Sequence, residues 1–82
     1  MNQELIKRLA AGEVVYQHTG TVEQWHEIMN AANIGDIKPF VYDELFYCNQ
    51  CFGNVWMYYT KEDQRRHPNL QIYTTEQFYG NR

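Results

Sequence analysis

The sequence predicts an α+β fold in which about four strands form a mainly antiparallel sheet, with two helices packed on one face and a short C-terminal helical turn. Two stretches near the N-terminus repeat apolar residues at the spacing of an amphipathic helix. The rest of the chain alternates short runs of aromatic and β-branched residues with Gly, Pro and Asn, as strands and turns do. From the length of 82 residues we expect one domain spanning residues 1–82.

The N-terminal segment is expected to form a short helix over residues 2–11 and a strand over residues 13–18. The helix places three apolar side chains on one face: Leu5, Ile6 and Leu9. Gly12 follows, at the position where a residue in the left-handed conformation commonly ends a helix. Successive side chains of a strand point to opposite faces, so one face of this strand is expected to carry Val14, Tyr16 and His18. The other face carries Val15 and Gln17.

The best-defined unit is a helix that follows the breaker Thr19-Gly20 and extends to Ala32. Thr21 and Gln24 form a capping box, in which each side chain binds the backbone N–H of the other residue. An apolar stripe follows at helical spacing: Val22, Trp25, Ile28, Met29 and Ala32. The side that faces solvent holds Glu23, His26, Glu27 and Asn30.

An aromatic hairpin is expected over residues 40–60, because Gly53-Asn54 suits a type II′ turn. This turn pairs Phe52 with Val55 and Cys48 with Tyr59. One face then carries the larger apolar set: Phe46, Cys48, Phe52, Val55, Met57 and Tyr59. Since helices cover only one side of the sheet, we expect the other face to be partly open to water and to carry Tyr47, Trp56 and Tyr58.

The C-terminal part begins with a mixed-charge stretch, residues 61–66, which is typical of a loop or of one exposed helical turn. Residues 70–74 alternate as a final strand. Thr74 with Gln77, or Thr75 alone, caps a last helical turn that packs two rings against the domain, Phe78 and Tyr79.

Charge and composition disfavour several classes of function. A net charge of −3 and a pI near 5.5 argue against sequence-independent binding to nucleic-acid phosphates, which needs clustered Lys and Arg. No segment approaches the roughly 20 apolar residues of a membrane span, and Glu4, Lys7 and Arg8 stand where a signal peptide is apolar. We therefore expect a cytoplasmic protein whose two cysteines are reduced thiols.

The motif Cys48-Asn49-Gln50-Cys51 resembles one half of a zinc knuckle. A structural zinc ion needs four ligands, so His67 would join the cysteines, together with one of three residues: His18, His26 or Asp63. The turn at Gly53-Asn54 opposes this site, because residues three apart along a strand point to opposite faces. We therefore favour ordinary thiols and no cofactor, and keep Cys48, Cys51 and His67 as the candidate metal ligands of an alternative reading.

Catalysis is not expected. A redox pair of cysteines needs a helix N-terminus to lower the thiol pKa, whereas a turn and a strand follow Cys51. The available acid–base residues form no known catalytic motif: His18, His26, His67, Glu23, Glu27, Asp43 and Glu44. A convergent pocket is also difficult to build in so small a domain. We predict a protein that is not an enzyme.

The abundance of aromatic residues, 16% of the chain, is the strongest remaining feature. Tyr and Trp commonly anchor protein interfaces. The candidate binding residues are therefore the rings of the open sheet face and the acids of the adjacent helix: Tyr47, Trp56, Tyr58, Glu23 and Glu27. The same rings are equally typical of core packing or of a homodimer contact. Base stacking is not expected, because Glu62 and Asp63 interrupt the local basic cluster.

Three segments surround the aromatic hairpin: LAAGEVV at residues 9–15, GTVEQW at 20–25 and IYTTEQF at 72–78. This arrangement resembles small uncharacterised α+β proteins encoded by bacteriophages and prophages, although the CNQC pair departs from their pattern. The resemblance implies a phage or mobile-element accessory protein in the host cytoplasm, which binds and can inhibit a host protein. The alternative is a small zinc-stabilised or nucleic-acid-associated domain that uses Cys48, Cys51 and His67.

Overall fold

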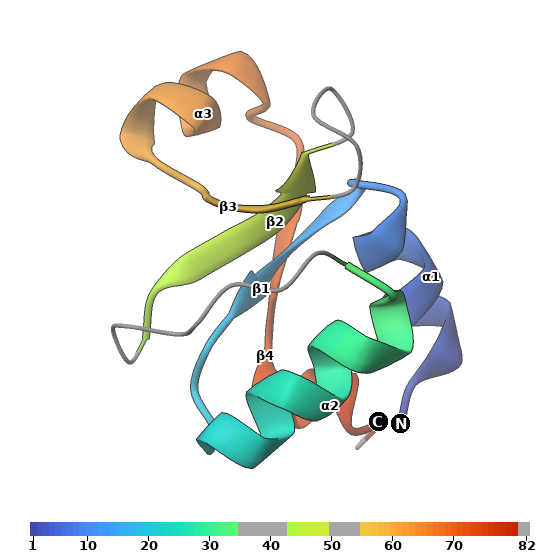
Figure 1. Ribbon diagram of the computed structural model, residues 1–82. Helices are drawn as coiled ribbons and strands as arrows, with labels where there is room; N and C mark the ends of the chain where they lie inside the picture. The colour runs from blue at the N-terminus through green and yellow to red at the C-terminus, as the bar shows by residue number, and fades with distance from the viewer. Residues whose placement is uncertain (35–42, 50–54, 81–82) are drawn as a thin grey trace.

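The computed structural model describes residues 1–34, 43–49 and 55–80, and it confirms an α+β fold (Figure 1). The strands are β1 (Val14–Gln17), β2 (Leu45–Asn49), β3 (Val55–Tyr58) and β4 (Gln71–Thr74). The helices are α1 (Gln3–Ala10), α2 (Val22–Ala32), α3 (Lys61–Arg66) and α4 (Thr75–Phe78). The expected strand start near residue 40 and the turn at Gly53-Asn54 lie outside the described residues.

The strands form one four-stranded sheet in the order β3-β2-β1-β4. The β1–β2 and β2–β3 pairs are antiparallel, as expected, whereas β4 lies parallel to β1. A parallel partner requires a long connection. The chain supplies it by leaving β3, forming α3 and returning along the far side of β1 (Figure 1).

Local side-chain caps explain where the helices begin. The Asn2 carboxamide oxygen accepts from the backbone N–H groups of Glu4 and Leu5 at the start of α1. The predicted capping box at Thr21 and Gln24 is present at the start of α2, with both bonds between 2.9 and 3.1 Å. These caps use residues within one turn, so the sequence alone specifies them.

The larger core cluster joins α1 and α2 to one side of the sheet, which we call the helix face. It buries the predicted apolar residues of both helices, apart from the exposed Val22. From the sheet it includes five side chains: Val14, Tyr16, Phe46, Cys48 and Trp56. Phe78 of α4 completes the cluster and is fully buried, as the predicted C-terminal turn requires.

The opposite side of the sheet, the reverse face, is covered at its centre, which corrects the expectation of an open face. Val15, Tyr47 and Tyr59 form a second buried cluster there. The mixed-charge stretch forms α3 over this cluster, and the Tyr47 hydroxyl donates to Asp63 Oδ1 at 3.3 Å. The Tyr59 hydroxyl donates to the backbone oxygen of His67 at 2.6 Å. A loop or one exposed helical turn was expected for residues 61–66, and the structure shows the helical form.

The hairpin register also differs from the expected one. Cys48 lies opposite Trp56, not Tyr59, and Tyr47 lies opposite Met57. The expected and observed pairings differ by three residues along β3. An odd shift moves every side chain of a strand to the other face, so Trp56 and Tyr58 lie on the helix face and Met57 on the reverse face.

Candidate functional site

The structure separates the aromatic residues that were expected to share one open face. Tyr47 lies on the reverse face, whereas Trp56 and Tyr58 lie on the helix face. Tyr47 is 6% exposed and Trp56 is 2% exposed, but Tyr58 is 37% exposed. The prediction that these three rings share one open face was therefore wrong. Tyr58 is the member of the set that is accessible at the surface.

Trp56 is buried because α2 presents a second large ring to it. The indoles of Trp25 and Trp56 stack with centroids 5.2 Å apart, and Phe46 meets each of them edge to face. Burying such a ring stabilises the domain by a few kcal/mol, roughly as much as any side chain can contribute. Among the described residues, the Trp56 indole Nε1 has no hydrogen-bond partner, and the contacts described hold the ring by packing.

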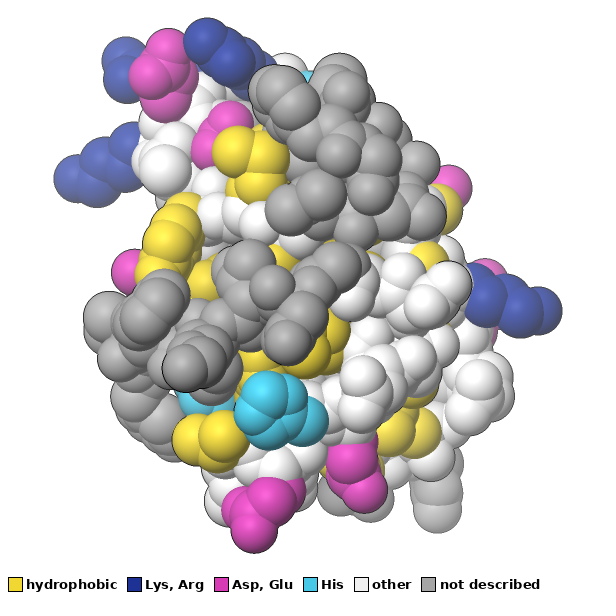
Figure 2. Space-filling view, viewed as in Figure 1, with side chains coloured by type: hydrophobic (Ala, Val, Ile, Leu, Met, Phe, Trp, Pro, Cys, Tyr) yellow, Lys and Arg dark blue, Asp and Glu magenta, His cyan; other side chains and the backbone are white. Residues whose placement is uncertain are grey.

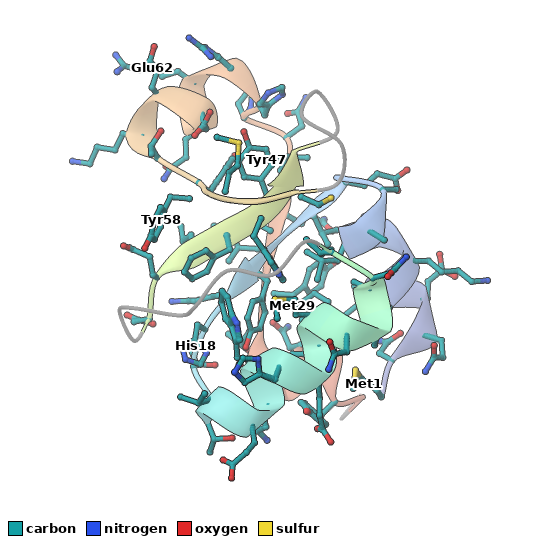
Figure 3. The ribbon with its side chains drawn as sticks, in the orientation of Figure 1. Met1, His18, Met29, Tyr47, Tyr58 and Glu62 are labelled. Carbon is teal, nitrogen blue, oxygen red and sulfur yellow. The ribbon has the colours of Figure 1, made fainter. Side chains whose placement is uncertain are left out.

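Tyr58 and Met57 form a small exposed apolar site on β3, which we call the β3 site. Each is 37% exposed, and because they are consecutive they lie on opposite faces of the same strand. Tyr58 packs on Phe46 with ring centroids 5.0 Å apart, so it forms the outer end of a row of rings that begins at Trp25. Figure 2 shows hydrophobic side chains over β3, and Figure 3 places Tyr58 at the outer edge of the sheet, away from Tyr47.

The backbone of β3 is also available at this edge. The Tyr59 N–H donates to the carbonyl oxygen of Leu45, so it points toward β2. Consecutive residues of a strand direct their backbone groups in opposite directions. The N–H and C=O groups of Trp56 and Tyr58 therefore point away from β2. Within the described part of the chain, no residue hydrogen-bonds these outward groups.

The candidate acidic residues lie exposed on α2. Glu23 and Glu27 are exposed, and α2 contains no Lys or Arg. Glu27 also accepts a hydrogen bond from the Tyr79 hydroxyl. Between residues 9 and 60 the sequence contains a single Lys or Arg, Lys38, so the central part of the chain is acidic. The basic residues of α3 balance only part of this charge.

The candidate metal ligands do not converge where the structure describes them. The Cys48 side chain is buried in the helix-face cluster. His67 is exposed beyond the reverse face, with its ring 6.4 Å from that of Tyr47. Cys51 lies outside the described residues. Among the described residues, no three side chains of His, Cys, Asp or Glu are grouped so that they could hold a metal ion.

The histidines occupy separate environments. His18 is buried beside Tyr16, whose hydroxyl lies 3.3 Å from His18 Nδ1 and 2.7 Å from Thr75 Oγ1. Burial lowers the pKa of His18, and burial raises the pKa of Tyr16 to about 12 despite the opposing bond to Thr75. His26 is exposed on α2. The buried polar cluster of Tyr16, His18 and Thr75 links the region of β1 to the start of α4.

Sequence reasoning missed Met57 and the outward backbone groups of Trp56 and Tyr58. Both follow from the hairpin register, which determines the face of every side chain and which backbone groups point outward. The size of the Trp56 side chain could have indicated the correct register. The largest apolar side chain of the hairpin should face the helix that carries Trp25.

Comparisons of the chain with known proteins identified no similar family, protein or structure. The chain matches no protein-family model, and no curated protein or solved structure shows significant similarity to it. Among the described helices, none is both long enough and apolar enough to span a membrane.

Proposed function

We propose that this chain is a small non-enzymatic domain that binds a host protein, as an accessory protein of a phage or mobile element in the host cytoplasm. The observation that supports the proposal is the β3 site. There, two large side chains, Met57 and Tyr58, are exposed at a sheet edge next to backbone groups that bond to no described residue. Edge strands of this kind bind partners by backbone hydrogen bonds and side-chain pockets.

The charge distribution supports a partner with a basic surface. Glu23 and Glu27 are exposed on α2, and the central part of the chain is acidic. Complementary charge speeds encounter and excludes partners of the wrong sign. The apolar contact at Tyr58 would provide the anchor, and the acidic helix would guide the approach. Binding at this site would block any activity that the partner performs with the covered surface.

Affinity capture from a bacterial lysate tests the proposal when it compares matched variants. We expect the wild-type chain to retain a specific protein that Tyr58→Ala loses. Ile72→Ala is the control, because Ile72 is also exposed, at 45%, but lies on β4 at the opposite edge. The doubly substituted variant Glu23→Gln and Glu27→Gln should bind more weakly and with less salt dependence. A partner captured equally by all variants would contradict the assignment of this surface.

A further inference from the structure

The two edges of the sheet differ in how they are protected. At the β4 edge, the Thr75 N–H points toward β1 and donates to Thr19 Oγ1 at 3.2 Å. The Thr74 N–H therefore points outward, and the side-chain oxygen of Gln77 binds it at 2.8 Å. At the β3 edge, the outward groups of Trp56 and Tyr58 have no such cap among the described residues. One outward group of the β4 edge is thus capped by a nearby side chain, whereas no described residue caps the outward groups of β3.

Strand β3 also lacks the features that usually prevent an edge from pairing. Natural edges carry Lys, Pro or inward charges that oppose association. Residues 55–60 contain no charged residue and no proline, so two copies of this strand can approach without placing like charges opposite each other. The exposed side chains at this edge, Met57 and Tyr58, are apolar and aromatic rather than charged.

From this geometry we infer that β3 pairs with β3 of a second copy of the chain, in an antiparallel arrangement with its twofold axis at Met57. In this register Trp56 of each copy lies opposite Tyr58 of the other, and each such pair exchanges both of its backbone hydrogen bonds. All the outward groups of Trp56 and Tyr58 are then satisfied. The two sheets join into one continuous sheet.

Side chains support the same register. The two Met57 residues meet across the axis on the reverse face, as a non-hydrogen-bonded pair with Cα atoms about 4.5 Å apart. Tyr58 meets the edge of the second copy on the helix face, where cross-strand aromatic contacts are favourable. The interface is self-complementary, as a twofold dimer requires. The dimer and the proposed complex with a host protein would use the same edge of β3, so the two would compete for it. The dimer is tested on the purified chain alone, so its failure and that of the host complex are distinguishable.

Sedimentation equilibrium of the purified chain tests the inference over roughly two decades of concentration. We expect the mass to rise from 9.9 kDa toward twice that value. Tyr58→Pro removes an outward N–H without removing a bond to β2, and it should weaken the dimer on the order of tenfold or more. Tyr58→Ala is the matched control, because it removes the ring but keeps the N–H, and it should weaken the dimer less.

A charge exchange at Met57 gives a second test that does not rely on proline. Met57→Lys and Met57→Glu each place like charges across the axis, so each variant alone should dimerise roughly fivefold more weakly. An equimolar mixture of the two should restore association. Circular dichroism and thermal unfolding of every variant check that the fold is intact. A wild-type chain that stays monomeric, or a mixture that does not recover association, would overturn the inference.

Discussion

The indoles of Trp25 and Trp56 stack at an interplanar angle of 23°, and this contact connects α2 to the edge strand of the sheet. It explains why Trp56 is buried while its neighbour Tyr58 is exposed. Along this segment the buried residues Trp56 and Tyr59 flank the exposed pair Met57 and Tyr58.

Replacement of Trp56 should affect stability, not recognition. Trp56→Ala removes a side chain that is 2% exposed and leaves a cavity beside Trp25, so it should lower the free energy of unfolding by about 3 to 5 kcal/mol. Tyr58→Ala, at a half-exposed position, should lower it by about 1 kcal/mol. Urea denaturation followed by circular dichroism measures both. Equal losses for the two variants would contradict the difference in burial between Trp56 and Tyr58.

The hydroxyl of Thr75 should stabilise the junction between β1 and α4. It accepts from the Thr19 N–H at 3.1 Å and lies 2.7 Å from the Tyr16 hydroxyl, in a site that is almost fully buried. Thr75→Val keeps the shape but removes the side-chain oxygen that the Thr19 N–H and the Tyr16 hydroxyl contact, which should cost about 1 to 3 kcal/mol. A Thr75→Val chain as stable as the wild type would refute this role.

Stability should fall in mild acid because His18 is buried as a neutral group. Burial lowers the pKa of His18 from 6.5, so the unfolded chain takes up a proton at a higher pH than the folded chain does. The contribution of His18 is therefore complete above pH 6.5 and is lost as the pH falls from 6.5 toward the lower pKa of the folded state.

Urea denaturation at about pH 7.5 and about pH 5 measures this change in unfolding free energy. His18→Asn should reduce the difference between the two conditions. His26→Gln, at an exposed position, should leave the difference as it is in the wild type. The prediction fails when the His18 and His26 variants show the same pH dependence.

Chelation should leave the fold unchanged. Cys48 is buried on the helix face and His67 is exposed beyond the reverse face, so these two candidate ligands lie on opposite sides of the sheet. Treatment with EDTA should shift Tm by less than about 1 °C, whereas removal of a structural zinc ion unfolds a small domain. Stoichiometric zinc in protein purified without added metal would contradict this expectation.

Sequence reasoning recovered the local features of the fold. The α+β class follows from the hydrophobic periodicity, and the capping boxes at Thr21 and Thr74 follow from residues three apart. The burial of Trp25 and Phe78 follows from the same periodicity. Such features depend on neighbours within one helical turn, and the identity of those neighbours is readable in the chain.

The candidate site could be predicted only in part, because it depends on pairing between distant residues. A turn preference at Gly53-Asn54 suggested one register, whereas packing of Trp56 against Trp25 is satisfied only by another. The odd difference between the registers exchanged the two faces of β3. Tyr58 remained accessible, and Met57 took the place on the reverse face that had been assigned to Trp56.

The amino-acid sequence by itself determined the helices, their caps and their buried sides, since short-range hydrogen bonds and apolar spacing specify them. Only the tertiary structure decided which rings of the hairpin are buried, which backbone groups of β3 point outward and that β4 lies parallel to β1. The physical reason is that strand register minimises the energy of the whole core. A contact between residues 31 positions apart, such as Trp25 with Trp56, outweighs the weaker preference of a two-residue turn.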